Sequence, residues 1–130
     1  TFRTPAGHLG ARLYDPRPQR PPGPVVLFFH GGGFVLGGLE SHDGFCAEMA
    51  RSLDLPVVAV DYRLAPEAPF PAALEDCEAA ARWLSAGDEA LGVRATSLVL
   101  VGDSAGGNLA VVTAQALRER PTAVPVIVQW

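Results

Sequence analysis

The residue type and spacing best suited to chemistry occur at Ser104, which stands between Gly102 and Gly106 in Gly-Asp-Ser-Ala-Gly. The aliphatic run Leu98–Val101 precedes this motif, and a stretch compatible with a helix begins at Ala105. A serine on a sharp strand-to-helix turn projects its hydroxyl away from the backbone, and the glycines on either side relieve crowding. The positive end of the following helix would face negative charge developing at the serine. The pattern predicts a nucleophilic serine; an incidental serine in a glycine-rich turn is the alternative.

A second aliphatic run, Val25–Phe29, leads within one residue to three consecutive glycines, Gly31, Gly32 and Gly33. Glycine leaves backbone N–H groups unobstructed, and N–H groups that converge on one point stabilise an oxyanion. A flexible loop and a phosphate cradle are the alternatives. A phosphate loop should end in Gly-Lys-Ser/Thr, and the sequence contains no lysine. The spacing to Gly37 is one residue too long for the dinucleotide-binding pattern.

Several residues close to these motifs are expected to support the site rather than to react. We expect the imidazole of His30 to bond nearby backbone and hold the glycine loop, with a general base as its alternative role. Arg63 and Glu67 follow the run 57–60 and are expected to form an ion pair that pins a proline-rich turn. Asp103, which precedes the serine, is also assigned to structural support, as are the two glycines on either side of the serine.

Short aliphatic runs bounded by turn residues are typical of buried parallel strands. Four such runs are present: Val25–Phe29, Val57–Val60, Leu98–Val101 and Val126–Val128. A weaker alternation over Leu9–Tyr14 predicts an antiparallel edge strand.

Three helices are predicted between these strands. The first has apolar residues at i, i+4 and i+8 behind a candidate N-cap, and the second has an apolar stripe between Pro71 and Gly87. The third covers Ala105–Arg118 and ends before a proline. The first set comprises Ser41, Phe45, Met49 and Leu53, and the second Leu74, Cys77, Ala81 and Leu84.

The alternation of strands and helices indicates an α/β fold with a mostly parallel sheet and helices on both faces. Residues 1–24 are expected to form the edge strand and a proline-rich connector. Residues 25–130 are expected to form three strand–helix units and a last strand. In such sheets ligands bind at the carboxyl ends of the strands, where both glycine-rich motifs stand.

Composition excludes several classes of protein. The 130 residues are 48% hydrophobic and 18% charged, which excludes a disordered chain. The net charge is −4 and no basic stripe is present, so nucleic acid is not an expected partner. The apolar runs are far shorter than the ~18 residues of a membrane span, and no secretory signal is visible. Cys46 and Cys77 are expected to be reduced core residues of a cytoplasmic protein.

Three segments taken together resemble the hormone-sensitive-lipase family of α/β-hydrolase esterases. Residues 30–34 are similar to its oxyanion motif, residues 61–67 to its Tyr-Arg-Leu-Ala-Pro-Glu turn, and residues 102–107 to its nucleophile elbow. The likeness runs in order from about Val25 to Trp130 and is closer to bacterial esterases than to the mammalian lipase. It implies a partial α/β-hydrolase fold.

The resemblance also implies roles for individual residues. Ser104 matches the nucleophile, and the N–H groups of Gly32, Gly33 and Ala105 match the oxyanion donors. Gly31 permits the turn and is a further candidate donor. The implied substrate is a small-molecule ester, with no metal and no organic cofactor. The implied lining of the acyl site is Phe34, Val35 and Leu36.

The sequence departs from the family in one respect. The family's triad runs Ser, Asp, His, with both partners after the nucleophile, whereas His8, His30 and His42 all precede Ser104. We therefore expect an incomplete domain that is inactive alone, with the acid and base outside it. A non-catalytic small-molecule-binding relative, an amidase and an arylformamidase remain alternatives. The segment Val124–Val128 is expected to form an exposed edge that promotes self-association.

Overall fold

The computed structural model describes residues 2–4, 7–31, 42–64, 71–88, 91–103, 105–122 and 124–129. Its helices are α1 (Asp43–Leu53), α2 (Ala72–Ala86) and α3 (Ala105–Glu119). The main sheet contains β3 (Ala11–Tyr14), β4 (Gly23–Phe29), β5 (Val57–Val60), β6 (Ala95–Gly102) and β7 (Val126–Gln129). A separate ribbon pairs β1 (Phe2–Thr4) with β2 (Gly7–Leu9).

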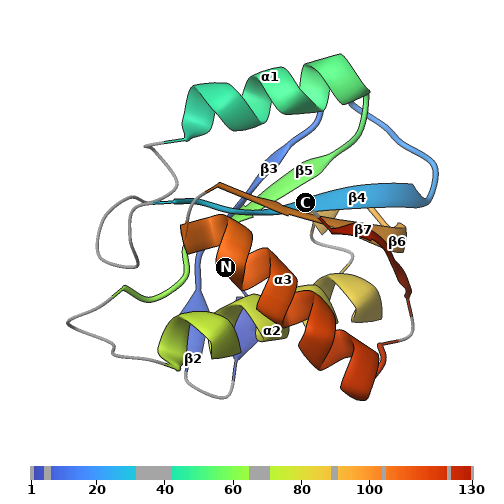
Figure 1. Ribbon diagram of the computed structural model, residues 1–130. Helices are drawn as coiled ribbons and strands as arrows, with labels where there is room; N and C mark the ends of the chain where they lie inside the picture. Colours follow the sequence, from blue (N-terminus) through green and yellow to red (C-terminus); the bar gives the residue numbers. More distant parts are fainter. Residues whose placement is uncertain are drawn as a thin grey trace.

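The main sheet is mostly parallel and carries helices on both faces, as the sequence predicts (Figure 1). The strand order is β3-β5-β4-β6-β7, in which only β3 runs antiparallel to its neighbour. Helix α1 lies on one face, and α2 and α3 lie on the other (Figure 1). This arrangement brings the carboxyl ends of β4, β5 and β6 to one edge.

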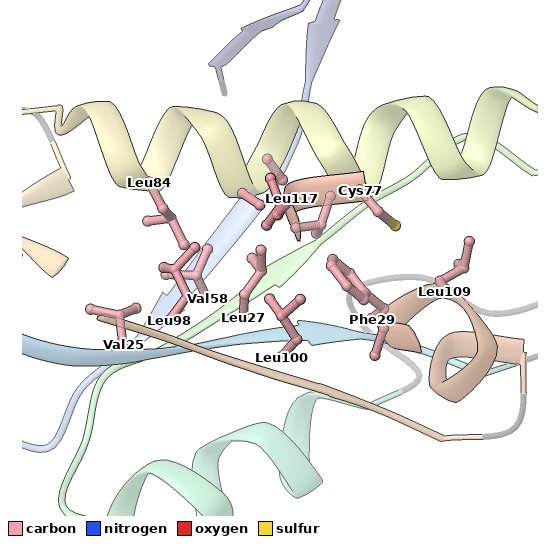
Figure 2. Packing of buried hydrophobic residues seen from close by; sticks show 14 of the residues in the cluster. Val25, Leu27, Phe29, Val58, Cys77, Leu84, Leu98, Leu100, Leu109 and Leu117 are labelled. Atoms are coloured by element: carbon pink, nitrogen blue, oxygen red, sulfur yellow. The ribbon is translucent and has the colours of Figure 1, made fainter. Parts of the chain in front are cut away.

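Alternating residues of the central strand β4 build two separate cores. Val25, Leu27 and Phe29 face α2 and α3, where Figure 2 shows them among the leucines of both helices. Val26 and Phe28 face α1. Because successive side chains of a strand point to opposite faces, an unbroken apolar run is needed where both faces are covered. This explains why the aliphatic runs predicted the strands of the main sheet well.

The predicted edge strand over Leu9–Tyr14 is wrong as a single element. The chain is divided at Gly10, because Leu9 pairs with Phe2 in the ribbon while Ala11 pairs with Val60 in the main sheet. Only β3 is therefore the antiparallel edge strand.

The apolar residues that predicted α1 are in a helix, but of the three only Met49 is partly buried, against the smaller core. Phe45 and Leu53 are 55% and 52% exposed, whereas Cys46 and Ala50 are buried against the sheet. Both sets fit a spacing of four residues, so the spacing alone does not decide which set faces the sheet. The N-cap position is occupied by His42, and Ser41 lies outside the described residues.

Helices α2 and α3 agree closely with the prediction. Helix α2 begins after Pro71 and ends at Gly87, whose φ of 88° suits glycine and whose N–H donates to the Trp83 carbonyl. Cys77, buried on this helix, belongs to the larger core. Across the described ranges, no helix combines the length and apolar character that a membrane crossing needs.

Both cysteines are free and buried. Burial raises the pKa of the Cys46 thiol to about 11 and raises that of Cys77 well above its ordinary value. Since the thiolate is the reactive form, both side chains act as small apolar groups.

We expect the stability of the fold to depend on the ionisation of Asp15. Its carboxylate accepts a hydrogen bond of 2.7 Å from Arg20, and both side chains are largely buried. The Arg20 guanidinium holds the pKa of Asp15 below its ordinary value of 3.8. The pair therefore stabilises the fold above that value and stops doing so as the pH falls through the lowered pKa. Urea denaturation across acidic pH should show a shallower pH dependence for Asp15→Asn than for the unchanged chain; identical curves would contradict this.

Candidate active site

The three segments singled out in the sequence start side by side at the carboxyl edge of the sheet. Phe29 pairs with Val60 of β5 on one side and with Gly102 of β6 on the other. The glycine run, the turn after β5 and the serine motif therefore begin at neighbouring positions in the sheet. Ligands of parallel α/β sheets bind at such an edge. The predicted site residues Ser104, Gly32, Gly33, Phe34, Val35, Leu36 and Glu67 lie outside the described residues.

Glycine is required on either side of the serine because other backbone segments approach these positions closely. A Cβ at Gly106 would lie 1.8 Å from the Phe29 carbonyl oxygen, and one at Gly102 would lie 2.1 Å from the Gly106 oxygen. A Cβ at Gly31 would lie 2.7 Å from the Asp103 oxygen. None of these glycines has a positive φ. At these three glycines the crowding is therefore contact between segments rather than a positive φ.

Helix α3 starts directly at this crowded corner. The N–H of Gly106 donates to the Asp103 carbonyl at 2.8 Å. Ala105 is the first residue of α3 and is 7% exposed. Backbone N–H groups in the first turn of a helix have no acceptor within the helix. The amide of Ala105 is one of these first-turn groups.

His30 is fixed among backbone groups and aromatic rings. Its Nδ1 lies 2.8 Å from the carbonyl oxygen of Gly31 and must donate to it, since that oxygen only accepts. Its own carbonyl accepts a 2.6 Å hydrogen bond from the Tyr62 hydroxyl, and the two rings stack with centroids 4.3 Å apart. Burial raises the pKa of Tyr62 well above its ordinary value, so the phenol stays a donor. These contacts suit a structural role for His30.

Asp103 joins the serine motif to the start of the glycine run. Its Oδ1 accepts a hydrogen bond of 2.8 Å from the Gly31 N–H. This amide already has an acceptor, so Gly31 does not offer the further oxyanion donor that the resemblance suggests. Its second oxygen, Oδ2, lies 3.1 Å from Nε2 of His42. Sequence reasoning assigned Asp103 to structural support without this geometry and matched His42 to no catalytic position.

Arg63 pairs with Asp76, a residue that sequence reasoning missed. The carboxylate of Asp76 is 1% exposed and accepts from the backbone N–H, Nε and Nη2 of Arg63 at 2.8, 2.9 and 2.9 Å. This pair fixes the chain leaving β5 against α2. An acidic residue beside Cys77 on the buried face of a helix was the available signal, because buried carboxylates need a partner.

We expect Asp76→Ala to lower the free energy of unfolding by about 2–3 kcal/mol, because three donors of Arg63 lose their acceptor. The figure is at the low end for a buried pair because the Arg63 side chain is 35% exposed. Urea denaturation measures the change. Glu75→Ala, its exposed neighbour on the same helix, should cost less than about 1 kcal/mol. Equal losses in the two variants would show that the pair adds nothing beyond helix electrostatics.

Comparisons with known proteins agree with this geometry. A family model described as an alpha/beta hydrolase fold matches residues 26–129. Esterase LipI of Mycobacterium tuberculosis is 50% identical over 117 residues, which are 88% of this chain and 37% of LipI. Human hormone-sensitive lipase is 46% identical over 96 residues, 72% of this chain and 9% of the lipase. A solved structure of an esterase from Pyrobaculum calidifontis superposes with a TM-score of 0.85 at 48% identity, covering 91% of this chain and 38% of that one.

The chain thus spans less than two fifths of the length of LipI and of the Pyrobaculum esterase. The part that it shares with them contains the sheet edge, the glycine run and the serine motif. The family model covers most of the chain and contains all three motifs. The chain therefore belongs to the α/β-hydrolase fold family, in its hormone-sensitive-lipase branch.

Proposed function

We propose that this chain carries the nucleophile and the oxyanion donors of a carboxylic-ester hydrolase. The observation that carries the proposal is the joining of the two motifs at the sheet edge, where the Gly31 N–H donates to the Asp103 carboxylate at 2.8 Å. This contact sets the start of the glycine run beside the residue that precedes Ser104. The names of LipI and of the Pyrobaculum protein as esterases support the same reaction.

In the proposed reaction the Ser104 hydroxyl attacks the ester carbonyl while a base removes its proton. The N–H groups of Gly32, Gly33 and Ala105 stabilise the negative charge on the tetrahedral intermediate. Collapse of the intermediate releases the alcohol, which takes the proton, and leaves an acyl group on Ser104. Water, activated by the same base, then releases the acid. The acyl chain lies against residues 34–36.

We further propose that the acid and base of this reaction come from residues outside these 130. His8 lies exposed in the β1–β2 ribbon, and His30 is buried in backbone and aromatic contacts. His42 directs Nε2 at Asp103. The order Ser, Asp, His of related hydrolases places both partners later in the chain than Ser104.

The test combines the chain with the segment of the Pyrobaculum esterase that follows its matched region, co-expressed as a complemented protein. We expect hydrolysis of p-nitrophenyl acetate only when both parts are present and only with Ser104 intact. Robust Ser104-dependent hydrolysis by the chain alone would contradict the assignment of the base. A folded complemented protein that hydrolyses no activated ester would contradict the proposed function.

The substrate in this proposal is a small-molecule ester. The two free, buried cysteines favour a reducing compartment such as the cytoplasm. Strand β7 is the last strand in the sheet order, and its neighbourhood, 124–128, is aliphatic and uncharged. We propose that the chain alone self-associates along this strand. A monomer in sedimentation velocity at high concentration would contradict that last point.

A further inference from the structure

Asp103 contacts three separate segments at the sheet edge. Its Oδ1 accepts from the N–H of Gly31 at 2.8 Å, and its Oδ2 lies 3.1 Å from Nε2 of His42. Its carbonyl oxygen accepts from the N–H of Gly106 at 2.8 Å. One residue therefore connects the end of β4, the start of α1 and the first turn of α3.

We propose that Asp103 and His42 are positioning residues for the oxyanion site. Asp103 fixes the first amide of the glycine run relative to the serine motif, and His42 holds the carboxylate in the orientation that does so. The inference rests on the proposed function for its catalytic meaning, whereas its geometric content concerns only described residues.

The exposure of Asp103 explains why a second contact is needed. Half of its side chain, 53%, is exposed, so packing alone does not select one orientation of the carboxylate. A side chain with free rotamers would give up its hydrogen bond to Gly31 part of the time. The contact from His42 restricts this rotation and keeps Oδ1 directed at the Gly31 amide.

His42 is itself held firmly enough to do this. It is the N-cap residue of α1, and its side chain makes no capping hydrogen bond there. Its ring packs against those of Phe28 and His30, with centroid distances of 5.6 and 6.0 Å. The next residue, Asp43, accepts from Arg12 at 2.9 Å and from the Tyr14 hydroxyl at 2.7 Å. The start of α1 is thus held at His42 by contacts at the sheet edge and at Asp43 by hydrogen bonds from β3.

Hydrogen-bond chemistry distinguishes positioning from a role as the base. A carboxylate only accepts, so Nε2 of His42 carries the hydrogen that points at Asp103. In Asp103→Asn the amide oxygen still accepts from Gly31, and its NH₂ group donates to His42 after the histidine shifts to the Nδ1-protonated tautomer. A positioning role survives this exchange, whereas a base oriented by the carboxylate loses its working tautomer and about 10⁴ in kcat.

The first experiment is nuclear magnetic resonance on the ¹⁵N-labelled chain at about pH 8. In Asp103→Ala we expect the Gly31 amide to exchange with solvent about fivefold to tenfold faster, as loss of one hydrogen bond to a half-exposed carboxylate implies. His42→Ala should give a smaller increase, and His42→Gln should largely restore protection. In Asp103→Asn protection should persist while the His42 ring nitrogens report the changed tautomer. Asp61→Ala, which alters the exposed aspartate that follows β5, is the matched control and should change neither signal.

Equal Gly31 exchange in the unchanged chain and in a folded Asp103→Ala variant would overturn the inference. If that variant does not fold, an unchanged His42 tautomer in Asp103→Asn overturns it alone. In the complemented protein, His42→Gln should keep most of kcat and leave KM unchanged, and a loss as large as that of Ser104→Ala would identify His42 as the base instead. Failure of the complemented protein to hydrolyse esters would refute the proposed function while leaving the resonance results as they are.

Discussion

Ser104→Ala is expected to lower kcat for p-nitrophenyl acetate in the complemented protein by a factor of about 10⁴ to 10⁶. The reason is that the covalent route through an acyl-enzyme is lost with the hydroxyl. The oxyanion donors and the binding surface persist, so a small residual rate and a similar KM should remain. Steady-state kinetics over a range of ester concentrations separates the two parameters.

Ser52→Ala provides the matched control for this variant, because it makes the same chemical change at an exposed position near the end of α1. It should leave kcat within about twofold, as surface substitutions away from the site usually do. A Ser104→Ala variant with at least a tenth of the original kcat would show that hydrolysis does not pass through this serine.

Gly106→Ala is expected to destabilise the fold by about 3 kcal/mol or more. The added methyl group would lie 1.8 Å from the carbonyl oxygen of Phe29 and 2.8 Å from that of His30. Both oxygens are backbone atoms, one in the last residue of β4 and one in the residue that follows it. Neither can move without disturbing the sheet. Urea denaturation followed by circular dichroism measures the loss, and failure to fold is its extreme form.

Two other glycine substitutions serve as controls for Gly106→Ala. A methyl group at Gly44, exposed in α1, meets nothing within 4 Å, so Gly44→Ala should stabilise the fold by about 0.5–1 kcal/mol. One at Gly107 would lie 3.2 Å from the Gly102 oxygen and should be tolerated far better than one at Gly106. If Gly106→Ala were as stable as Gly107→Ala, close approach would not explain the glycine pattern of the motif.

The main sheet could be predicted from sequence because both of its faces are covered. Such strands are unbroken aliphatic runs, and 57–60 was located to the residue. The buried face of α1 could not be predicted in the same way. Phe45 and Leu53 are more hydrophobic than Cys46 and Ala50 and have the same spacing of four residues, yet Cys46 and Ala50 are the buried set.

The motifs of the candidate site could be predicted because they are local in sequence. The contacts that support them could not, because they join positions far apart in the chain. Asp103 and His42 meet only once β4 and β6 pair in register and α1 packs on their face. Arg63 and Asp76 meet only when α2 lies against the exit of β5. The spacing of residues along the sequence does not reveal which distant residues come into contact.

The most direct test of the central claim is to identify the residue that a reactive phosphate triester modifies in the complemented protein. An activated serine attacks the phosphorus of diethyl p-nitrophenyl phosphate, which forms a diethylphosphoryl-serine ester and releases p-nitrophenolate. Mass spectrometry of the digested protein locates the adduct. We expect one adduct, on the peptide that contains Ser104, with hydrolysis of p-nitrophenyl acetate lost in proportion to its formation. An adduct on another residue, or hydrolysis that survives complete modification of Ser104, would contradict the account.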